Sequence, residues 1–294
     1  MSKRILLVRW TQSGQVAAAA DAFVTPLRAA GHEVVERVLS PVTPYPFPWK
    51  MKSFFGVFPE TVLGRPDPID RVPTDGDFDL VILAAQVWFL SPSMPFQALL
   101  TGPDAAIVRG RRVLTLMVCR NMWVVGWRKL VRLVGAAGGD VTDNVAATFA
   151  GSVMASYFTA LYSMLSGRKK VGGHTIGVAE DGLARLARLG SVLADRVANA
   201  SPGAPLLAGE VTHTLSYPHA LGEQIAGRLF PLLARLIALT SRPGSFLRGI
   251  WAWFVLAFVL SNVFGLLIPC FTAWFLFGRR IRRWLDRQAS LPVR

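Results

Sequence analysis

The sequence predicts an α/β fold built on a doubly wound, five-stranded parallel β-sheet, followed by an apolar and basic helical region. Short continuous apolar runs recur along the first half of the chain, and helical segments alternate with them. Continuous apolar runs are typical of parallel strands that are buried on both faces. The last third differs, because its apolar residues form long uninterrupted runs that arginines close.

Five segments have the composition of buried strands. We expect them at residues 4–10, 33–38, 79–85, 112–118 and 140–149. We expect helices at residues 15–30, 95–108, 122–136 and 181–199, the last with an apolar stripe along one face. These elements place a domain over residues 1–200, and a helical, basic region over residues 201–294.

The segment 40–77 interrupts the alternation with many prolines and aromatic residues. They are Pro41, Pro44, Tyr45, Pro46, Phe47, Pro48, Trp49, Phe54, Phe55 and Phe58. Prolines at this density disfavour a central strand or helix. The aromatic content argues against disorder. We therefore expect an ordered insertion that acts as a lid.

The charge is unevenly distributed. The chain carries a net charge of +14, and the stretch from Arg228 onward holds ten arginines and one acid, Asp286, which is a net charge of +9. The same stretch contains residues 249–278, which include no charged side chain. Basic residues that flank an apolar run indicate a membrane surface as partner, and not nucleic acid. No zinc-finger spacing or aromatic-basic RNA motif is present.

Residues 249–278 fit either one tilted membrane span or a shallow hairpin of two helices. As a single helix the run is about 45 Å long, against a hydrocarbon core of ~30 Å. Asn262, Gly265 and Pro269 near its middle favour a break. The preceding domain and the basic residues 279–283 should both stay in the cytoplasm, which favours the hairpin. We expect a peripheral or monotopic protein at the cytoplasmic face of the inner membrane; a buried hydrophobic subdomain is the alternative.

Two further segments bear on the membrane and the compartment. Residues 225–239 carry Arg228 and Arg235 on one helical face, as an interfacial helix does. The charge-free residues 144–167 either line an apolar substrate channel or contact lipid. Two isolated cysteines, without a signal-peptide pattern at the N-terminus, indicate a reducing compartment.

The turn after the first strand has the composition of a phosphate site. Thr11, Gln12, Ser13, Gly14 and Gln15 supply two hydroxyls, two amides and a glycine just before a helix. A phosphate monoester needs such donors together with a helix N-terminus. The turn lacks the lysine of a Walker loop and the G-x-G-x-x-G pattern, so its neutral donors suit the phosphate of FMN. An ordinary cap by Ser13 is the alternative.

Two more segments follow predicted strand ends, where doubly wound sheets bind ligands. The first supplies Gln86, Val87, Trp88 and Phe89, whose aromatic pair can flank a planar ring or pack in the core. The second supplies Cys119, Arg120 and Asn121, of which Arg120 and Asn121 can bond a flavin edge or a substrate oxygen.

The sequence leaves the catalytic group open. The candidates are Arg120, Asn121, Tyr157 and His174, with His213 as a further proton-transfer candidate. We expect Cys119 to be a small buried residue and not a nucleophile. No HExxH, GxSxG or CxxC motif occurs, and we expect no metal site.

Several of these segments together resemble a known family. Residues 11–15, 44–49, 58–64, 86–93 and 119–123 are similar to those of the flavodoxin-like dialkylresorcinol-condensing enzymes, which accompany a ketosynthase in bacterial aryl-lipid pathways. The resemblance covers residues 1–170. It implies a flavodoxin-like fold, an FMN cofactor, and an aromatase that oxidises a dialkyl-cyclohexane-1,3-dione to a dialkylresorcinol. A pathway ketosynthase is the protein partner that it implies.

The expected function is thus an FMN-dependent oxidoreductase acting on a lipophilic ring at a membrane surface. Aromatisation removes a hydride and a proton, and FMN can accept the hydride. One alternative is a flavodoxin-like electron carrier or ketosynthase partner without a substrate site. A NAD(P)H:quinone reductase is the other.

Overall fold

Five parallel strands form the central sheet in the computed structural model, which describes residues 2–149, 151, 153–172, 174–199, 201 and 203–290. The strands are β1 (Arg4–Arg9), β2 (Glu33–Val38), β3 (Leu80–Trp88), β5 (Arg112–Cys119) and β6 (Asp140–Thr148). Their order is β2-β1-β3-β5-β6, and each neighbouring pair is parallel. Among the long strands this is the order 2-1-3-4-5 of flavodoxin-like sheets, so the predicted fold class is confirmed.

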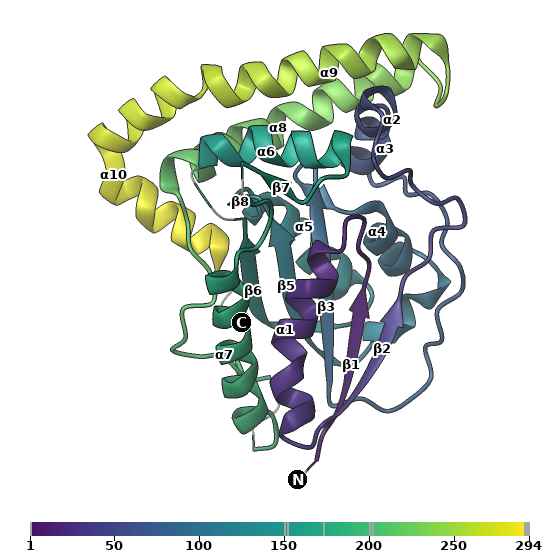
Figure 1. Ribbon diagram of the computed structural model, residues 1–294, viewed down its shortest axis with the longest axis vertical. Helices are drawn as coiled ribbons and strands as arrows, with labels where there is room; N and C mark the ends of the chain where they lie inside the picture. Colours follow the sequence, from purple (N-terminus) through teal and green to yellow (C-terminus); the bar gives the residue numbers. More distant parts are fainter. Residues whose placement is uncertain are drawn as a thin grey trace.

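Alternate side chains of each strand enter two separate cores. Ile5 and Leu7 pack with α1 (Gln15–Ala29) and α7 (Glu180–Val197), whereas Leu6 and Val8 belong to the core under α4 (Met94–Thr101) and α5 (Val124–Ala136). Successive strand residues point to opposite faces, so a strand covered on both sides is apolar throughout. Figure 1 shows α1 and α7 side by side over one face of the sheet.

A glycine sets the distance between those two helices. A Cβ at Gly190 of α7 would lie 2.1 Å from the carbonyl oxygen of Phe23 in α1. Only a residue without a side chain allows this approach. The apolar stripe that we expected along residues 181–199 is the face of α7 that packs against α1 and the sheet.

The helix that we expected at residues 95–108 is two elements. The α-helix α4 ends at Thr101, and a 3₁₀ helix, η1 (Pro103–Val108), follows it. A Cβ at Gly102 would lie 2.6 Å from the carbonyl oxygen of Ala98, and Pro103 has no N–H to continue the helical bonds. The prediction of one continuous helix is therefore wrong.

The proline-rich insertion is ordered, but it contains two short helices that we did not expect, α2 (Met51–Gly56) and α3 (Phe58–Leu63). The prolines of residues 41–48 precede both helices, and Pro59 occupies the first turn of α3, where a proline is tolerated. A third unexpected helix, α6 (Val153–Ser166), occupies most of the charge-free residues 144–167. Three two-residue strands complete the β-structure: β4 (Ser91–Pro92), β7 (Lys170–Val171) and β8 (His174–Thr175).

Three long helices lie across the carboxyl end of the sheet (Figure 1). They are α8 (Tyr217–Thr240), α9 (Phe246–Gly265) and α10 (Leu267–Ala289). The apolar residues 249–278 are thus divided between two helices that meet at Leu266, within the stretch where we expected a break. Among the described residues, no helix combines the length and the hydropathy of a bilayer span.

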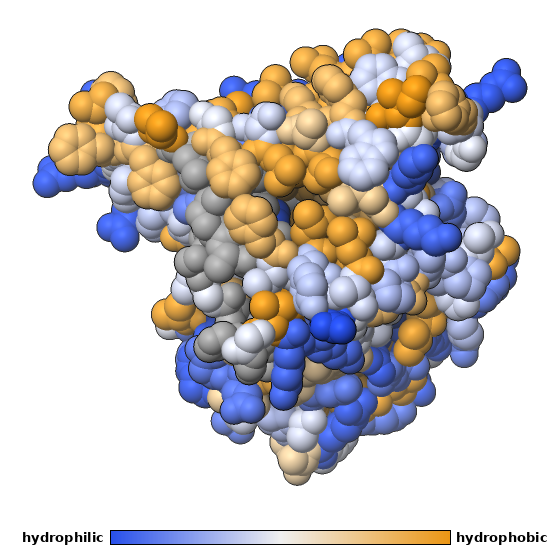
Figure 2. All heavy atoms as spheres, turned by 45° about the horizontal axis from the view of Figure 1, so that its top comes forward, coloured by the Kyte–Doolittle hydropathy of each residue, from blue (hydrophilic) through white to orange (hydrophobic). Residues whose placement is uncertain are grey.

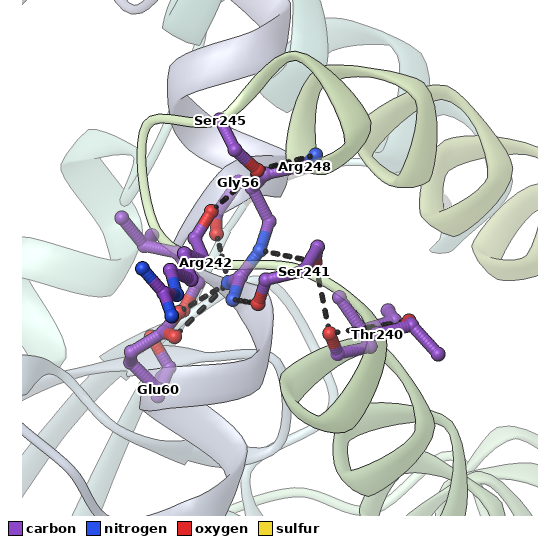
Figure 3. A network of polar contacts seen from close by, with 10 residues as sticks. Gly56, Glu60, Thr240, Ser241, Arg242, Ser245 and Arg248 are labelled. Carbon is purple, nitrogen blue, oxygen red and sulfur yellow. Dashed lines mark hydrogen bonds and ion pairs between the residues drawn. The ribbon is translucent and has the colours of Figure 1, made fainter.

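A buried arginine holds α9 against the insertion. The Arg248 guanidinium, 4% exposed, donates to the Glu60 carboxylate and to the carbonyl oxygens of Gly56 and Ser241. Figure 3 shows these groups converging on the guanidinium from α2, α3 and the turn after α8. A buried charge is tolerated when it is paired and hydrogen-bonded in this way. The contact places α9 above the site described next.

Candidate functional site

One cavity of about 320 Å³ lies at the carboxyl end of the sheet, within the size range of small-molecule sites. Its wall combines the segments that end or follow β1, β3 and β5 with side chains of α6, α8, α9 and α10. Ligands of doubly wound sheets bind at this edge, where the strand order reverses. The predicted cofactor residues on the wall are Gln12, Ser13, Gln15, Gln86, Val87, Trp88, Phe89, Cys119 and Arg120.

The cavity has a polar end and an apolar end. The polar end is formed by Gln12, Ser13 and Gln15 of the loop together with Gln86 and Arg120. The apolar end lies among the helices, and its wall includes Phe158, Leu161, Ala226, Phe230, Leu256, Val259, Leu260, Phe264 and Phe271. Part of the charge-free stretch that we assigned to a channel or to lipid therefore lines the cavity.

The loop between β1 and α1 has the geometry of an anion site. Gly14 precedes α1 with φ of 86°, a left-handed conformation that glycine adopts without strain. No side chain caps the helix, so the cap by Ser13, which was the alternative to a phosphate site, is absent. The buried Thr11 hydroxyl has no partner among the described residues. An uncapped helix start beside an unpartnered hydroxyl can receive an anion.

The side-chain amides of the two glutamines in the loop make hydrogen bonds within the chain. The Gln12 side-chain amide donates to the carbonyl oxygens of Tyr45 and Pro46 in the insertion, at 3.1 and 2.9 Å. The Gln15 amide donates to the Ile176 carbonyl and accepts from the Val178 N–H. Each amide therefore fixes a neighbouring segment over the loop, while both side chains still line the cavity.

A lysine that we did not single out lies next to the loop. A Cβ at Gly14 would lie 3.2 Å from Nζ of Lys169, so this ammonium group sits beside the start of α1. Lys169 belongs to the basic run 168–170 that follows α6. The run was visible in the sequence, but only the fold brings it to a loop some 155 residues earlier, so its role had no local signal.

The turn after β3 is strained and points a polar atom at the site. Phe89 and Leu90 have φ values of 46° and 57° in the two-residue turn that joins β3 to β4. Left-handed conformations of such residues cost of order 1–3 kcal/mol each and persist where packing fixes them. Phe89 packs on Phe54 and Phe58. The buried Gln86 Oε1, just before this turn, has no hydrogen-bond partner in the described part of the chain.

Trp88 lies at the centre of an aromatic cluster. Of the two roles that we considered for it, flanking a planar ring or packing in the core, this arrangement corresponds to packing. It makes edge contacts with Trp10, Tyr45, Trp49 and Phe54, with ring centroids 5.3 to 6.3 Å apart. Trp88 is buried and also lines the cavity. The cluster therefore joins the end of β1, the insertion and β3 into one rigid wall of the site.

The segment after β5 contributes unequally. Cys119 is buried, and its burial, with the Glu223 carboxyl nearby, raises the pKa of the thiol, so it is a poor nucleophile at neutral pH. Arg120 lines the cavity. Asn121 is not part of the wall, and its buried Nδ2 has no partner among the residues described.

The remaining catalytic candidates are Tyr157, His174 and His213. Tyr157 lies in α6 and His174 in β8, and their side chains are outside the described part of the structure. The His213 ring packs against Trp123, with centroids 4.9 Å apart, and is not on the wall. His213 therefore has a packing role.

A different histidine lies on the wall. His219, in the first turn of α8, lines the cavity, and its buried Nε2 has no partner among the described groups. Nδ1 lies 2.8 Å from the Ser216 hydroxyl, which fixes the ring. Burial lowers the pKa of His219, so the ring is neutral at pH 7 and can accept a proton. Nothing in the sequence around residue 219 distinguished it from the other histidines.

A buried carboxyl group lies behind this wall. Glu223 of α8 is fully buried, and its Oε1 accepts from the Val125 N–H at the start of α5, at 2.7 Å. Burial raises the pKa of Glu223 to about 8. The group is therefore protonated at neutral pH and links α8 to α5 without a buried charge. In the described part of the chain, no group of three His, Cys, Asp or Glu side chains is arranged to hold a metal.

No protein-family model matches the sequence, and a search of curated proteins gave no match. Similar solved structures include a flavodoxin from the domain Archaea, at 10% identity over 67% of this chain and 99% of that one, with a TM-score of 0.38. A NAD(P)H:quinone oxidoreductase from Methanothermobacter marburgensis matches at 11% identity over 66% and 100%, with a TM-score of 0.36. A flavone reductase matches at 11% identity over 67% and 63%, with a TM-score of 0.35. At these values the fold assignment rests on the strand order itself.

Proposed function

We propose that this protein is an FMN-dependent oxidoreductase that oxidises a lipophilic ring. The proposal rests on one continuous cavity, which joins the loop after β1 to an apolar chamber between α6, α8, α9 and α10. A cofactor phosphate fits the polar end, and a hydrocarbon-bearing substrate fits the other end. An electron carrier without a substrate would need no such chamber.

The groups at the polar end suit FMN. The Thr11 hydroxyl, the uncapped start of α1 and the Lys169 ammonium would hold the phosphate. Gln86 Oε1 is an acceptor without a partner among the described residues, and a flavin ring presents an N–H that can donate to it. Trp88 and its aromatic neighbours would form an apolar wall beside the ring. Bound FMN would supply a two-electron acceptor, which this chain's own side chains lack.

His219 is the residue that we assign to proton removal. In the tautomer whose Nδ1–H donates to Ser216, Nε2 carries a lone pair that no described group uses, and we assign this nitrogen to accept a proton from a substrate C–H or O–H. The lowered pKa keeps this nitrogen unprotonated at neutral pH. The insertion would shield the same space from water: Trp49 is buried, and its backbone N–H donates to the Met164 carbonyl of α6, at 2.9 Å.

The substrate class that we propose is a dialkyl-cyclohexane-1,3-dione, aromatised to the dialkylresorcinol. The resemblance of residues 1–170 to dialkylresorcinol-condensing enzymes favours this ring, and the chamber suits its alkyl chains. The oxidation would remove one hydride, which bound FMN would accept, and one proton, which His219 would accept, and tautomerisation would complete the aromatic ring. A pathway ketosynthase is the protein partner that this role would have.

The test is spectroscopic. The purified protein should take up FMN with a yellow absorption band, and a dialkyl-cyclohexane-1,3-dione should bleach that band without oxygen. A protein that stays colourless with FMN would refute the whole proposal. A flavoprotein that the dione does not reduce would refute only the aromatase role.

A quinone reductase is the second candidate, because the same apolar chamber would accept a quinone. The two reactions run in opposite directions, so one measurement separates them. If NAD(P)H alone bleaches the flavin and a quinone restores its colour, the protein is a reductase. If NAD(P)H has no effect and the dione bleaches, the aromatase assignment holds.

A further inference from the structure

The outer face of α8, α9 and α10 exposes large apolar side chains over most of its length. On α9 these are Phe246, Ile250, Trp253, Phe254 and Phe264, whose spacing places them along one side of the helix. The same face continues onto α8 and α10 with Leu232, Leu236, Leu239, Ile268, Phe271, Phe275 and Leu276. Figure 2 shows these apolar surfaces gathered over the helices that cap the molecule. We call this set of residues the apolar face.

The apolar face is unusual for a surface in contact with water. Phe246 is 85% exposed, and Phe275 is 88% exposed. The one charged residue of α9, Arg248, points inward and is paired with Glu60, so the outer side of α9 has no charge. Single exposed apolar residues are normal, whereas a contiguous patch of this kind marks an interaction site.

The charges around the apolar face identify the partner. Exposed arginines bracket it: Arg228 and Arg235 on α8, Arg242 after α8, and the group 279–283 on α10. Asp286 is the sole acid between residue 228 and residue 290. Two copies of this chain joined through the face would bring these arginines together, which opposes association. An anionic lipid surface satisfies both the arginines and the apolar side chains.

The cavity opens toward the same face. Phe158, Phe264 and Phe271 line the cavity, and each is also exposed at the surface. The rings of Phe158 and Phe264 lie 6.1 Å apart at this opening. A compound dissolved in lipid could therefore reach the apolar chamber without crossing water.

We propose that the apolar face docks on an anionic lipid bilayer, with its side chains at the boundary of the hydrocarbon and its arginines among the headgroups. The docked cavity then receives its substrate directly from the bilayer. Docking follows from the surface alone; the route of the substrate rests on the proposed oxidoreductase function.

Vesicle flotation tests the docking. The full-length protein should float with vesicles of phosphatidylcholine and phosphatidylglycerol, and much less with phosphatidylcholine alone. The double variant Trp253→Ser, Phe275→Ser should bind at least about tenfold more weakly, because two anchors are lost. Replacing Arg279, Arg280 and Arg283 by Gln should reduce binding about fivefold for each charge and remove the preference for anionic lipid. The matched control is Val42→Ser, Val211→Ser, which changes two exposed apolar residues elsewhere.

A second measurement leaves the apolar face apolar. Lipids brominated in their acyl chains should quench part of the tryptophan fluorescence, and Trp253→Phe should remove most of that quenching. Absence of flotation with anionic vesicles, or equal binding by the anchor variant and its control, would overturn the proposal. So would self-association that the anchor variant abolishes, which would assign the face to a second copy. Because neither assay reads flavin, a colourless protein that binds vesicles would refute the oxidoreductase proposal alone.

Discussion

Arg248 donates to both carboxylate oxygens of Glu60, at 3.0 and 2.8 Å, across 188 positions of the chain. The pair joins α9, which lines the apolar end of the cavity, to the short helix α3, which follows the cavity-lining residues Phe54 and Phe55 of α2. The placement of the chamber therefore depends on an ion pair between the first third of the chain and the last.

Substituting Glu60 by Gln should destabilise the fold by about 2–3 kcal/mol. The substitution keeps the shape of the side chain but leaves the buried guanidinium with neutral acceptors only. Urea unfolding followed by tryptophan fluorescence measures the change. The control is Glu33→Gln, which breaks an exposed pair with Arg4 and should cost under about 1 kcal/mol. Equal costs for the two variants would show that the Arg248 pair does not hold α9.

Substituting Gly14 by Ala should abolish tight FMN binding. Alanine is strained at φ of 86°, and its Cβ would lie 3.2 Å from Lys169 Nζ, where the phosphate should bind. Gly31→Ala is the matched control, because Gly31 has φ of 84° but open space around it. Both variants should lose about 1–2 kcal/mol of stability, and Gly14→Ala alone should lose FMN in a fluorescence titration. Similar FMN affinities for both would contradict a phosphate site at this loop.

Lys169→Gln should weaken FMN binding about tenfold and leave riboflavin binding unchanged. Riboflavin lacks the phosphate, so the difference isolates the ammonium–phosphate interaction. The weakening should diminish in high salt, because Lys169 is exposed. Lys170→Gln, one residue along the same basic run, serves as the control. A loss of both ligands would mean that Lys169 acts through the fold of the loop instead.

The sequence predicts the sheet well, because β1, β3 and β5 are marked by largely apolar runs of adjacent residues, a signal that can be read without knowing the tertiary contacts. It predicts the proline-rich insertion less well. A high density of prolines excludes long helices, but α2 and α3 have only six residues each and can form there. The loop residues 11–15 were recognisable because a phosphate site is built from adjacent residues. Lys169 and His219 were not, because each acquires its neighbours only when α6 and α8 fold over the sheet. Gln12 and Gln15 were recognisable as hydrogen-bond donors, but their contacts were not. In the fold, their Nε2 groups donate to backbone carbonyl oxygens of distant segments.

His219→Gln should slow substrate-dependent flavin reduction by about 10²–10⁴-fold, with FMN affinity unchanged. In the wild type the rate should fall as the pH drops through the lowered pKa of His219, below 6.5, because the protonated ring cannot accept a proton. The variant should lose this dependence. Stopped-flow absorbance under anaerobic conditions measures both effects. His213→Gln is the control, since that ring packs on Trp123 away from the cavity wall; an equal effect there would remove His219 from the mechanism.

Glu223 should make the protein less stable as the pH rises toward 8. Its pKa is about 8 in the folded state and about 4.5 in the unfolded chain, so between these values the folded protein holds a proton that the unfolded chain has lost. The contribution of Glu223 to the free energy of unfolding is fully present below the pKa of the unfolded chain. It is lost as the pH rises toward the pKa of the folded state. Glu223→Gln keeps the acceptor for the Val125 N–H but does not titrate. The stability of the variant relative to wild type, from urea unfolding at several pH values, should therefore rise by up to about 1.4 kcal/mol per pH unit between 5 and 8 and then level off. A difference that does not change with pH would mean that Glu223 is ionised in the folded protein, and that α8 meets α5 through a buried charge.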